Sequence, residues 1–184
     1  MKRLLCAVIG LCLPLACGMA QAALDLSGDI TASSTLADPE NPTHYAPAKA
    51  FDNNPRTIWS EGASGDGVGE TIAINFGQPI LADEVRVMPG FFNPTWWGKN
   101  GRVRRATLYF DDWEMDVTFR DVMKIQPCQL PKALSFERFT LRIDAVYPGT
   151  HYGDTCISEI QFFINGKRIP IDTHLLDRKL GETP

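Results

Sequence analysis

The feature that most constrains the fold is a succession of short segments in which apolar and polar residues alternate. In the stretch 71–76, Ile72, Ile74 and Phe76 are separated by smaller or more polar residues, a period of two that is typical of a half-buried β-strand. The same alternation recurs at Val85 and Val87, at Ala106, Leu108 and Phe110, at Val117 and Phe119, at Phe139, Leu141 and Ile143, and at Ile160, Phe162 and Ile164. Turn-forming residues separate these runs, with Asp111–Asp112 as an expected hairpin turn, and no long run has the period of a helix. At least six short strands predict an all-β fold, an antiparallel β-sandwich with long loops.

The first 22 residues have the pattern of an export signal. Lys2 and Arg3 precede the apolar run LLCAVIGLCLPLA, and Ala20-Gln21-Ala22 supplies the small-x-small pattern at which signal peptidase cleaves. The apolar run is shorter than the roughly 20 residues of a spanning helix. Cleavage after Ala22 predicts an exported protein, either periplasmic or secreted. The alternative is a lipoprotein acylated at Cys17, which Pro14 disfavours because a lipobox has an aliphatic residue at that place.

The chain that remains after cleavage is acidic. The signal segment holds two of the 18 Lys and Arg residues and none of the 22 Asp and Glu residues, so 16 basic and 22 acidic residues remain, a formal charge of −6. An acidic domain without a basic run disfavours nucleic acid as a partner and charge-driven binding to anionic membranes. No later stretch is long and apolar enough for a transmembrane segment. We expect the sandwich to occupy 23–164, followed by a C-terminal tail, 165–184.

Two cysteines, Cys128 and Cys156, remain after this cleavage. A pair of cysteines in an exported chain predicts a disulfide, which would contribute about 3 kcal/mol in the chain-entropy model. The alternative is two separate, reduced thiols.

Catalytic motifs are missing from the sequence. None of the three histidines stands in an H-E-x-x-H pattern, and there is no G-x-S-x-G elbow. The dense carboxylates Asp111, Asp112, Glu114 and Asp116 surround the expected hairpin turn, where solvated turn chemistry explains them better than a glycosidase pair does. We therefore expect a protein that is not an enzyme.

The segment 49–59, KAFDNNPRTIW, combines turn formers with oxygen donors. Asp52 and Asn53 favour a tight turn, which would direct carbonyls, a carboxylate and the Thr57 hydroxyl into one small space. These are the hard oxygen ligands that Ca²⁺ prefers. From the residues alone, a well-made loop without metal is the favoured explanation of the segment, since no EF-hand pattern is present.

Several motifs, in this order, resemble those of a known family. TASS at 31–34 and APAKAFDNNPRTIWSE at 46–61 resemble the opening of discoidin domains, also called coagulation factor 5/8 type C domains. The later motifs are GDGVGETIAINFGQP at 65–79, NGRVRRATLYF at 100–110 and RIDAVYPGTHYGDTCISEIQFF at 142–163. They are similar to the subfamily called the NADase-type glycan-binding domain. The resemblance implies a galactose-binding-like jelly-roll sandwich that binds glycans and does not catalyse a reaction.

The resemblance also bears on calcium. Relatives in the wider superfamily hold a structural Ca²⁺ between the turn described above and a glutamate near the last strand. The matching positions in this sequence are Lys49, Asp52, Asn54, Thr57, Ser158 and Glu159. Asn53 stands where a glycine is usual, and asparagine tolerates the left-handed conformation better than most residues. The resemblance thus implies one structural calcium ion and no organic cofactor.

Aromatic and polar residues in two loops are the candidates for sugar contacts. Sugar sites pair flat aromatic faces with groups that hydrogen-bond hydroxyls. The candidates are Trp96, Trp97, Asn100, Arg102, Arg104, Tyr147, His151, Tyr152 and Asp154. A solvated strand face for the two arginines, or core packing for one tryptophan, is the alternative. In FFNPTWWGKN, 91–100, we expect Phe91 and Phe92 to be core residues and the tryptophans to form the contact surface.

We therefore predict an exported, non-catalytic glycan-binding module whose partner is a glycan or glycoconjugate. The alternative is a protein–protein or cell-envelope assembly module on the same fold, with an envelope protein as its partner and no sugar binding. Nothing in the sequence specifies the glycan.

Overall fold

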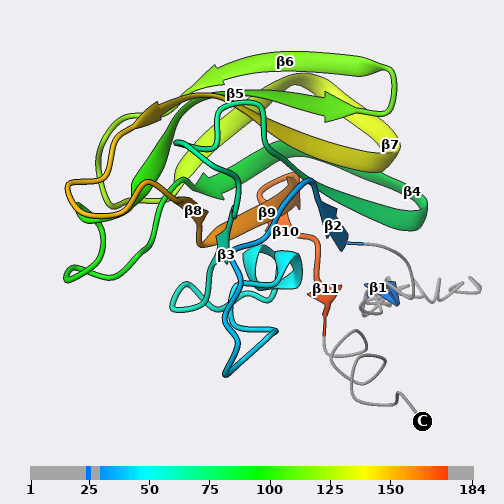
Figure 1. Ribbon diagram of the computed structural model, residues 1–184. Helices are drawn as coiled ribbons and strands as arrows, with labels where there is room; N and C mark the ends of the chain where they lie inside the picture. The colour runs from blue at the N-terminus through cyan, green and yellow to red at the C-terminus, as the bar shows by residue number, and fades with distance from the viewer. Residues whose placement is uncertain (1–23, 26–29, 174–184) are drawn as a thin grey trace, which may run out of the picture.

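The computed structural model describes residues 24–25 and 30–173, so the expected signal peptide and residues 174–184 lie outside it. Within the described residues the structure is all-β, with one 3₁₀ turn and no α-helix (Figure 1). The elements are β1 Leu24–Asp25, β2 Ile30–Ala32, η1 Pro47–Ala50, β3 Trp59–Ser60, β4 Thr71–Met88, β5 Gly101–Phe110, β6 Trp113–Thr118, β7 Gln126–Tyr147, β8 Thr155–Ile157, β9 Glu159–Ile164, β10 Lys167–Arg168 and β11 Ile171–Asp172.

Nine strands form one curled sheet in the order β10-β9-β4-β7-β5-β8-β3, with β2 paired to β4 and β6 paired to β5. Strand β4 pairs with β7 along one edge and with β2 and then β9 along the other. In Figure 1 the strands β5, β6 and β7 lie over β9 and the turn η1, so the curled sheet closes on itself as a β-sandwich. This is the fold class that the alternating segments predict.

Two details differ from the expected pattern of short antiparallel strands. The segments at 71–76 and 85–87 are the two halves of one strand, β4, whose pairing with β7 shifts register between Asn75 and Ile80. Gly77 lies at this irregularity with φ of 68°, a conformation that favours glycine. The sheet is also mixed, because β5 and β8 pair in parallel at Gly101 and Thr155.

The core consists of the apolar residues that the alternation places on the inner faces of the strands. Phenylalanines dominate it, and Phe110, Phe136 and Phe162 are among those that pack edge-on or tilted against one another at centroid distances of 5.0–6.0 Å. The buried Trp59 anchors the long loop before β4, and its Nε1 donates to the carbonyl of Ser34 at 3.1 Å. Ordered loops of this length need such apolar anchors.

The turns confirm one prediction and correct another. Phe110 pairs with Trp113, so Asp111 and Asp112 form the predicted two-residue hairpin turn, with Asp111 at a φ of 49°. In contrast, the prediction that Phe91 and Phe92 are core residues is wrong. Both are half-buried, because they lie in the loop after β4 and pack on the tryptophans of the same loop.

The expected C-terminal tail begins with packed residues. Lys167 and Arg168 form β10 against β9, and Ile169 is 4% exposed within the core cluster. In the part of the chain that the structure describes, no helix has the length and apolar character needed to cross a membrane.

Candidate functional site

A pocket of about 190 Å³ opens at the end of the sandwich where the loops 33–46, 91–100 and 148–154 meet. We call it the aromatic pocket. Its lining residues are Leu36, Tyr45, Ile58, Ser60, Phe91, Trp96, Asn100, Tyr152, Asp154 and Cys156. Ile58, Ser60 and Cys156 are at most 3% exposed and form the floor, whereas Tyr152 is 39% exposed at the rim.

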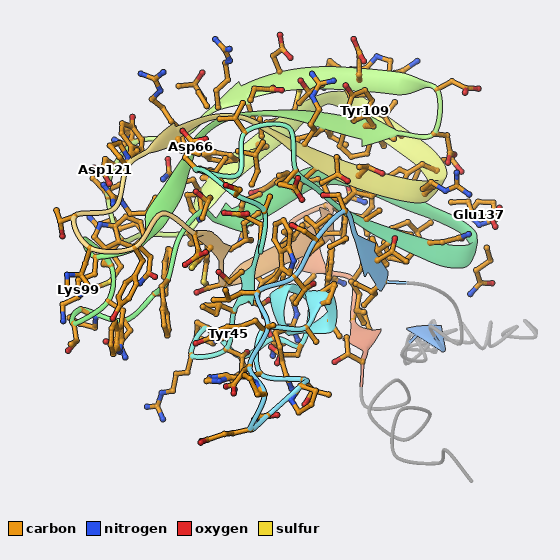
Figure 2. The ribbon with its side chains drawn as sticks, in the orientation of Figure 1. Tyr45, Asp66, Lys99, Tyr109, Asp121 and Glu137 are labelled. Atoms are coloured by element: carbon orange, nitrogen blue, oxygen red, sulfur yellow. The ribbon has the colours of Figure 1, made fainter. Side chains whose placement is uncertain are left out.

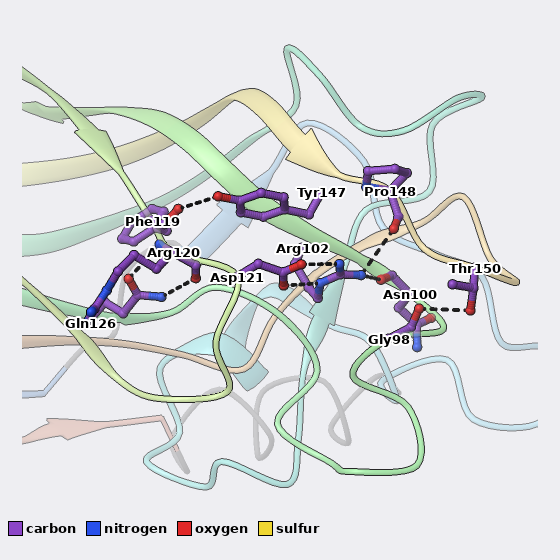
Figure 3. A network of polar contacts seen from close by, with 10 residues as sticks. All are labelled: Gly98, Asn100, Arg102, Phe119, Arg120, Asp121, Gln126, Tyr147, Pro148 and Thr150. Carbon is purple, nitrogen blue, oxygen red and sulfur yellow. Dashed lines mark hydrogen bonds and ion pairs between the residues drawn. The ribbon is translucent and has the colours of Figure 1, made fainter.

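Backbone hydrogen bonds hold two of these loops together. The N–H groups of His151 and Tyr152 donate to the carbonyl of Lys99 at 3.1 and 2.9 Å, and Thr150 donates to Gly98 through both its N–H and its hydroxyl at 3.0 Å (Figure 3). Gly149 is essential to this junction, because a Cβ there would overlap the carbonyl oxygens of Lys99 and Tyr152. The rims of the pocket are therefore fixed relative to each other by main-chain contacts.

Aromatic rings form much of the wall. The ring of Trp96 lies 6.1 Å from that of Tyr152 and 6.4 Å from that of Phe91, to which it is nearly parallel at 11°. The ammonium of Lys99 is 4.7 Å from the centroid of the Trp96 ring. Tyr45, which the loop 33–46 contributes to the lining, stacks on His44 at a centroid distance of 4.3 Å.

The polar groups of the pocket keep hydrogen-bonding capacity. Asn100 is 9% exposed and its Nδ2 donates to the Trp96 carbonyl at 3.0 Å, while its Oδ1 accepts no bond from the described residues. The Asp154 carboxylate likewise has no hydrogen bond or ion pair with the residues that the structure describes. Burial, reinforced by the charge of Asp38, raises the pKa of the Tyr45 hydroxyl, which therefore remains a neutral donor.

Arg102 does not line the pocket, and its guanidinium makes hydrogen bonds within the fold. Its Nε and Nη2 both donate to the Asp121 carboxylate at 2.8 Å, and its Nη1 donates to the carbonyls of Asn100 at 2.8 Å and Pro148 at 3.2 Å (Figure 3). Arg102 is 7% exposed. We call these contacts the Arg102 network. Through one side chain, the network connects the loop that bears Asp121 to the loops that end at Asn100 and begin at Pro148.

The structure brings some of the sequence-predicted residues together and separates the others. Trp96, Asn100, Tyr152 and Asp154 line the pocket, whereas Trp97, Arg102, Arg104, Tyr147 and His151 do not. Trp97 packs against Phe92 at 5.4 Å, and the Tyr147 hydroxyl donates to the Phe119 carbonyl at 3.1 Å. Arg104 is exposed at an irregularity of β5, and His151 is an exposed neighbour of Tyr152.

Sequence reasoning missed the part of the pocket that the earlier loop supplies. Tyr45 and Leu36 come from the long loop before β4, far from Trp96 in the chain. Tyr45 follows His44 in NPTHYAP, a turn-rich stretch that carries an aromatic pair. That pairing of turn formers and aromatics is the same signal that marked 91–100, and it would have indicated this loop.

Comparison with protein families gives a match over most of the chain. Residues 23–163 match the family described as the NAD glycohydrolase translocation F5/8 type C domain. The chain belongs to this family. The membership confirms the discoidin-type resemblance of the sequence motifs. The description concerns the translocation domain of an NAD glycohydrolase and not the glycohydrolase reaction, in agreement with a non-catalytic module.

Solved structures show the same fold at low sequence identity. The family 32 carbohydrate-binding module of NanJ from C. perfringens, in complex with galactose, is 19% identical with a TM-score of 0.53, over 72% of this chain and 92% of that one. The chitosan-binding module 1 of a chitosanase/glucanase from Paenibacillus sp. IK-5 is 18% identical with a TM-score of 0.54, over 77% and 98%. The arabinofuranosyltransferase AftD from Mycobacteria is 22% identical with a TM-score of 0.61, over 79% of this chain and only 11% of that much longer one. No curated protein matches this chain.

The predicted metal loop of this F5/8 type C domain brings its two carboxylates together. Thr57 Oγ1 donates to Asp52 Oδ2 at 2.8 Å, and the Asn54 N–H lies 2.9 Å from Asp52 Oδ1 and 3.0 Å from Glu159 Oε1. Burial, followed by the neighbouring Asp52 carboxylate, raises the pKa of Glu159 to about 8. Asn53 has φ of 59°, the left-handed conformation that a tight turn requires here.

These residues fit a divalent cation, because a cation between Asp52 and Glu159 would offset both the burial of Glu159 and the repulsion between the carboxylates. Lys49 lies in the 3₁₀ turn η1 just before Asp52, and Ser158 is buried beside Glu159 with its Oγ accepting from the Phe92 N–H at 2.9 Å. The described residues contain no cluster of three or more His, Cys, Asp or Glu side chains that could hold a metal. Carbonyl and hydroxyl oxygens would therefore have to complete the shell.

The predicted disulfide is wrong. Cys128 and Cys156 are both free thiols, at 7% and 1% exposure. Cys128 lies on β7 opposite Val85 of β4, whereas Cys156 lies on β8 between β3 and β5. Burial raises the pKa of each thiol to about 12, so both behave as small apolar side chains.

Proposed function

We propose that this protein binds carbohydrate in the aromatic pocket and acts as a non-catalytic binding module. The observation that carries the proposal is the combination of aromatic walls with the Asn100 Oδ1 and the Asp154 carboxylate, which accept no hydrogen bond from the described residues. Such an arrangement suits a sugar ring, whose C–H faces pack on aromatic rings and whose hydroxyls need hydrogen-bond partners. The family membership and the fold shared with modules described as carbohydrate-binding support it.

In this function Trp96 and Tyr152 contact the apolar face of the sugar, and Asn100 and Asp154 bond its hydroxyls. The Arg102 network keeps the loops in place, so the site exists before the sugar arrives. Preorganisation of this kind lowers the ordering cost of binding. The N-terminal pattern supports export, so we place the binding event outside the cytoplasm, in the periplasm or in the medium.

A glycan array followed by calorimetric titration tests the proposal. Tyr152→Ala and Trp96→Ala should each weaken binding about tenfold or more, because aromatic contacts at a binding site contribute about 1–3 kcal/mol. Tyr109→Ala is the matched control, since Tyr109 is a half-buried tyrosine on β5, away from Lys99 and Tyr45 in Figure 2. Failure of every glycan to bind, together with capture of an envelope protein by the wild type, would favour the assembly-module alternative.

We also propose that Asp52, Thr57 and Glu159, with the carbonyls of Lys49, Asn54 and Ser158, hold a structural calcium ion. When bound, the ion supplies charge compensation and fixes the turn against β9. Calcium in excess over a chelator should raise the midpoint of thermal unfolding by about 5 °C or more, whereas magnesium at equal concentration should have a smaller effect. Asp52→Asn should lose the calcium shift and Asp112→Asn should keep it, since Asp112 is exposed at the β5–β6 turn. Equal midpoints with and without calcium would reject the ion.

A further inference from the structure

The residues that line the aromatic pocket carry charge of only one sign, which is negative. Among the described residues that line it, Asp154 is the one charged side chain, and there is no lysine or arginine. The two arginines that the sequence suggested as sugar donors are elsewhere, Arg102 neutralised by Asp121 and Arg104 exposed on β5. A ligand in this pocket therefore meets one carboxylate among the lining residues, and the Lys99 ammonium lies next to the wall, against the Trp96 ring.

The wall around that carboxylate is aromatic. The rings come from all three loops and are those of Tyr45, Phe91, Trp96 and Tyr152. Aromatic faces carry negative electrostatic potential and attract cations, with a contribution of about 0.5–2 kcal/mol that grows when water is excluded. The ammonium of Lys99, 4.7 Å from the Trp96 centroid, already makes such a contact. The Asp154 carboxylate and the aromatic rings therefore both favour a positively charged ligand.

Asp154 also lacks an internal role for its side chain. Its backbone carbonyl accepts from the Gly101 N–H at 2.8 Å and so fixes the start of β8, but its carboxylate bonds to no described residue. By comparison, Asp121 and Glu61 each use both carboxylate oxygens for internal contacts. A carboxylate that has no hydrogen-bond partner within the fold and lies beside aromatic rings can bind a cationic group of a ligand.

We propose that the preferred ligand of the aromatic pocket is a sugar that carries a free, protonated amino group, held by Asp154 and the surrounding rings. This inference rests on the proposed carbohydrate-binding function and narrows it to one chemical class. An N-acetylated sugar loses the charge and keeps the ring, and a uronic acid brings a second carboxylate beside Asp154. We expect the order of affinity to be amino sugar, then N-acetylated or plain neutral sugar, then uronic acid.

The test is a calorimetric or NMR titration at pH 6 with glucosamine, N-acetylglucosamine, glucose and glucuronic acid, and with galactosamine and galactose to vary hydroxyl stereochemistry. At this pH an amine with a pKa of about 7.7 or above is protonated. The amino sugar of the better-bound series should bind about tenfold more tightly than its neutral counterparts. In Asp154→Asn this ratio should fall to about one, while Asp112→Asn, an exposed carboxylate on the β5–β6 turn, should keep it. Circular dichroism and thermal unfolding of each variant establish that it is folded.

The outcomes separate the two proposals. If neutral sugars bind as tightly as amino sugars, or if Asp154→Asn keeps the amine preference, the inference is wrong and carbohydrate binding stands. A preference for glucuronic acid that disappears in Lys99→Met would overturn the inference in favour of recognition through Lys99. If no sugar of any class binds the wild type, carbohydrate binding itself fails, and the inference fails with it.

Discussion

Two groups of residues lie side by side at the loop end of the sandwich and use their polar atoms in opposite ways. In the Arg102 network the guanidinium donates to two carboxylate oxygens and two backbone carbonyls. In the aromatic pocket the Asp154 carboxylate and the Asn100 Oδ1 accept nothing from the described residues. Asn100 belongs to both groups, through its backbone carbonyl in the network and through its side chain in the pocket. The two groups differ in whether their polar atoms already have hydrogen-bond partners within the fold.

This difference assigns a role to each group. A buried polar group whose partners lie within the fold contributes to shape, and its loss leaves the partners unsatisfied. A polar group at a pocket without partners is available to a ligand. The network should therefore respond to substitution with a loss of stability, and the pocket with a loss of affinity. The substitutions of Arg102, Gly149 and Cys156 below test that division.

The largest effect is expected for Arg102→Ala. The substitution removes four hydrogen bonds and leaves two carbonyls without this donor, which should lower the free energy of unfolding by about 3 kcal/mol. Urea unfolding measures the change. Arg104→Ala is the matched control: Arg104 is exposed, so its removal should change stability by about 0.5 kcal/mol or less. Similar values for the two variants would contradict the structural role of the network.

A smaller loss is expected for Gly149→Ala. Its Cβ would overlap two backbone carbonyl oxygens, and backbone cannot move aside as a flexible side chain can. Overpacking of this kind costs about 1–3 kcal/mol, and here it would also separate the loops that bear Trp96 and Tyr152. Gly98→Ala is the control, because a Cβ there meets no atom within 4 Å. Stability and glycan affinity should fall together in Gly149→Ala and stay near wild type in Gly98→Ala.

A pH-dependent effect is expected from Glu61, which holds the loop before β4 against the start of β8. Its carboxylate accepts from the N–H groups of Thr155 at 2.9 Å and Ala63 at 2.8 Å, and burial raises its pKa above the ordinary 4.5. The folded protein therefore holds this proton more tightly than the unfolded chain does. The stability that Glu61 contributes is present at low pH and is lost as pH rises through the raised pKa.

The measurement is urea unfolding from pH 3 to 8, which spans the region below the ordinary pKa of 4.5 as well as above it, with the difference between wild type and Glu61→Gln taken at each pH. This difference should decrease as pH rises. For Glu70→Gln the difference in stability from wild type should change with pH in the opposite direction. The hydroxyls of Ser33 and Ser34 lower the pKa of Glu70, so the stability that Glu70 contributes is lost as pH falls. Parallel slopes for the two variants would show that burial of Glu61 does not govern its ionisation.

The sequence predicted the strands and the turn chemistry because these depend on local spacing. The Asp111–Asp112 turn and the inward residues of β4, β5, β7 and β9 follow from alternation alone. The pocket could be predicted only in part, because it depends on which loops meet. Trp96 and Tyr152 were found from their own loops, but Tyr45 joins them through a contact between distant segments. Arg102 was misinterpreted because spacing places it in a polar stretch and only the fold reveals Asp121 beside it.

The smallest effect is expected for reducing agent, and it concerns the two thiols. The sequence suggested a bridge because it predicts export and leaves two cysteines after cleavage, yet Cys128 and Cys156 are on different strands and are both free. A reductant should leave the midpoint of thermal unfolding unchanged, since there is no bridge to break. In the native protein at pH 8 a thiol reagent should label neither residue, because burial raises both thiol pKa values to about 12, and both should be labelled after unfolding in denaturant.

Cys156 tests the division between stability and affinity most directly. It lines the pocket floor but is 1% exposed, so Cys156→Ser should affect stability more than affinity. A fall in the midpoint of thermal unfolding on addition of reductant would instead support the disulfide that the sequence predicted.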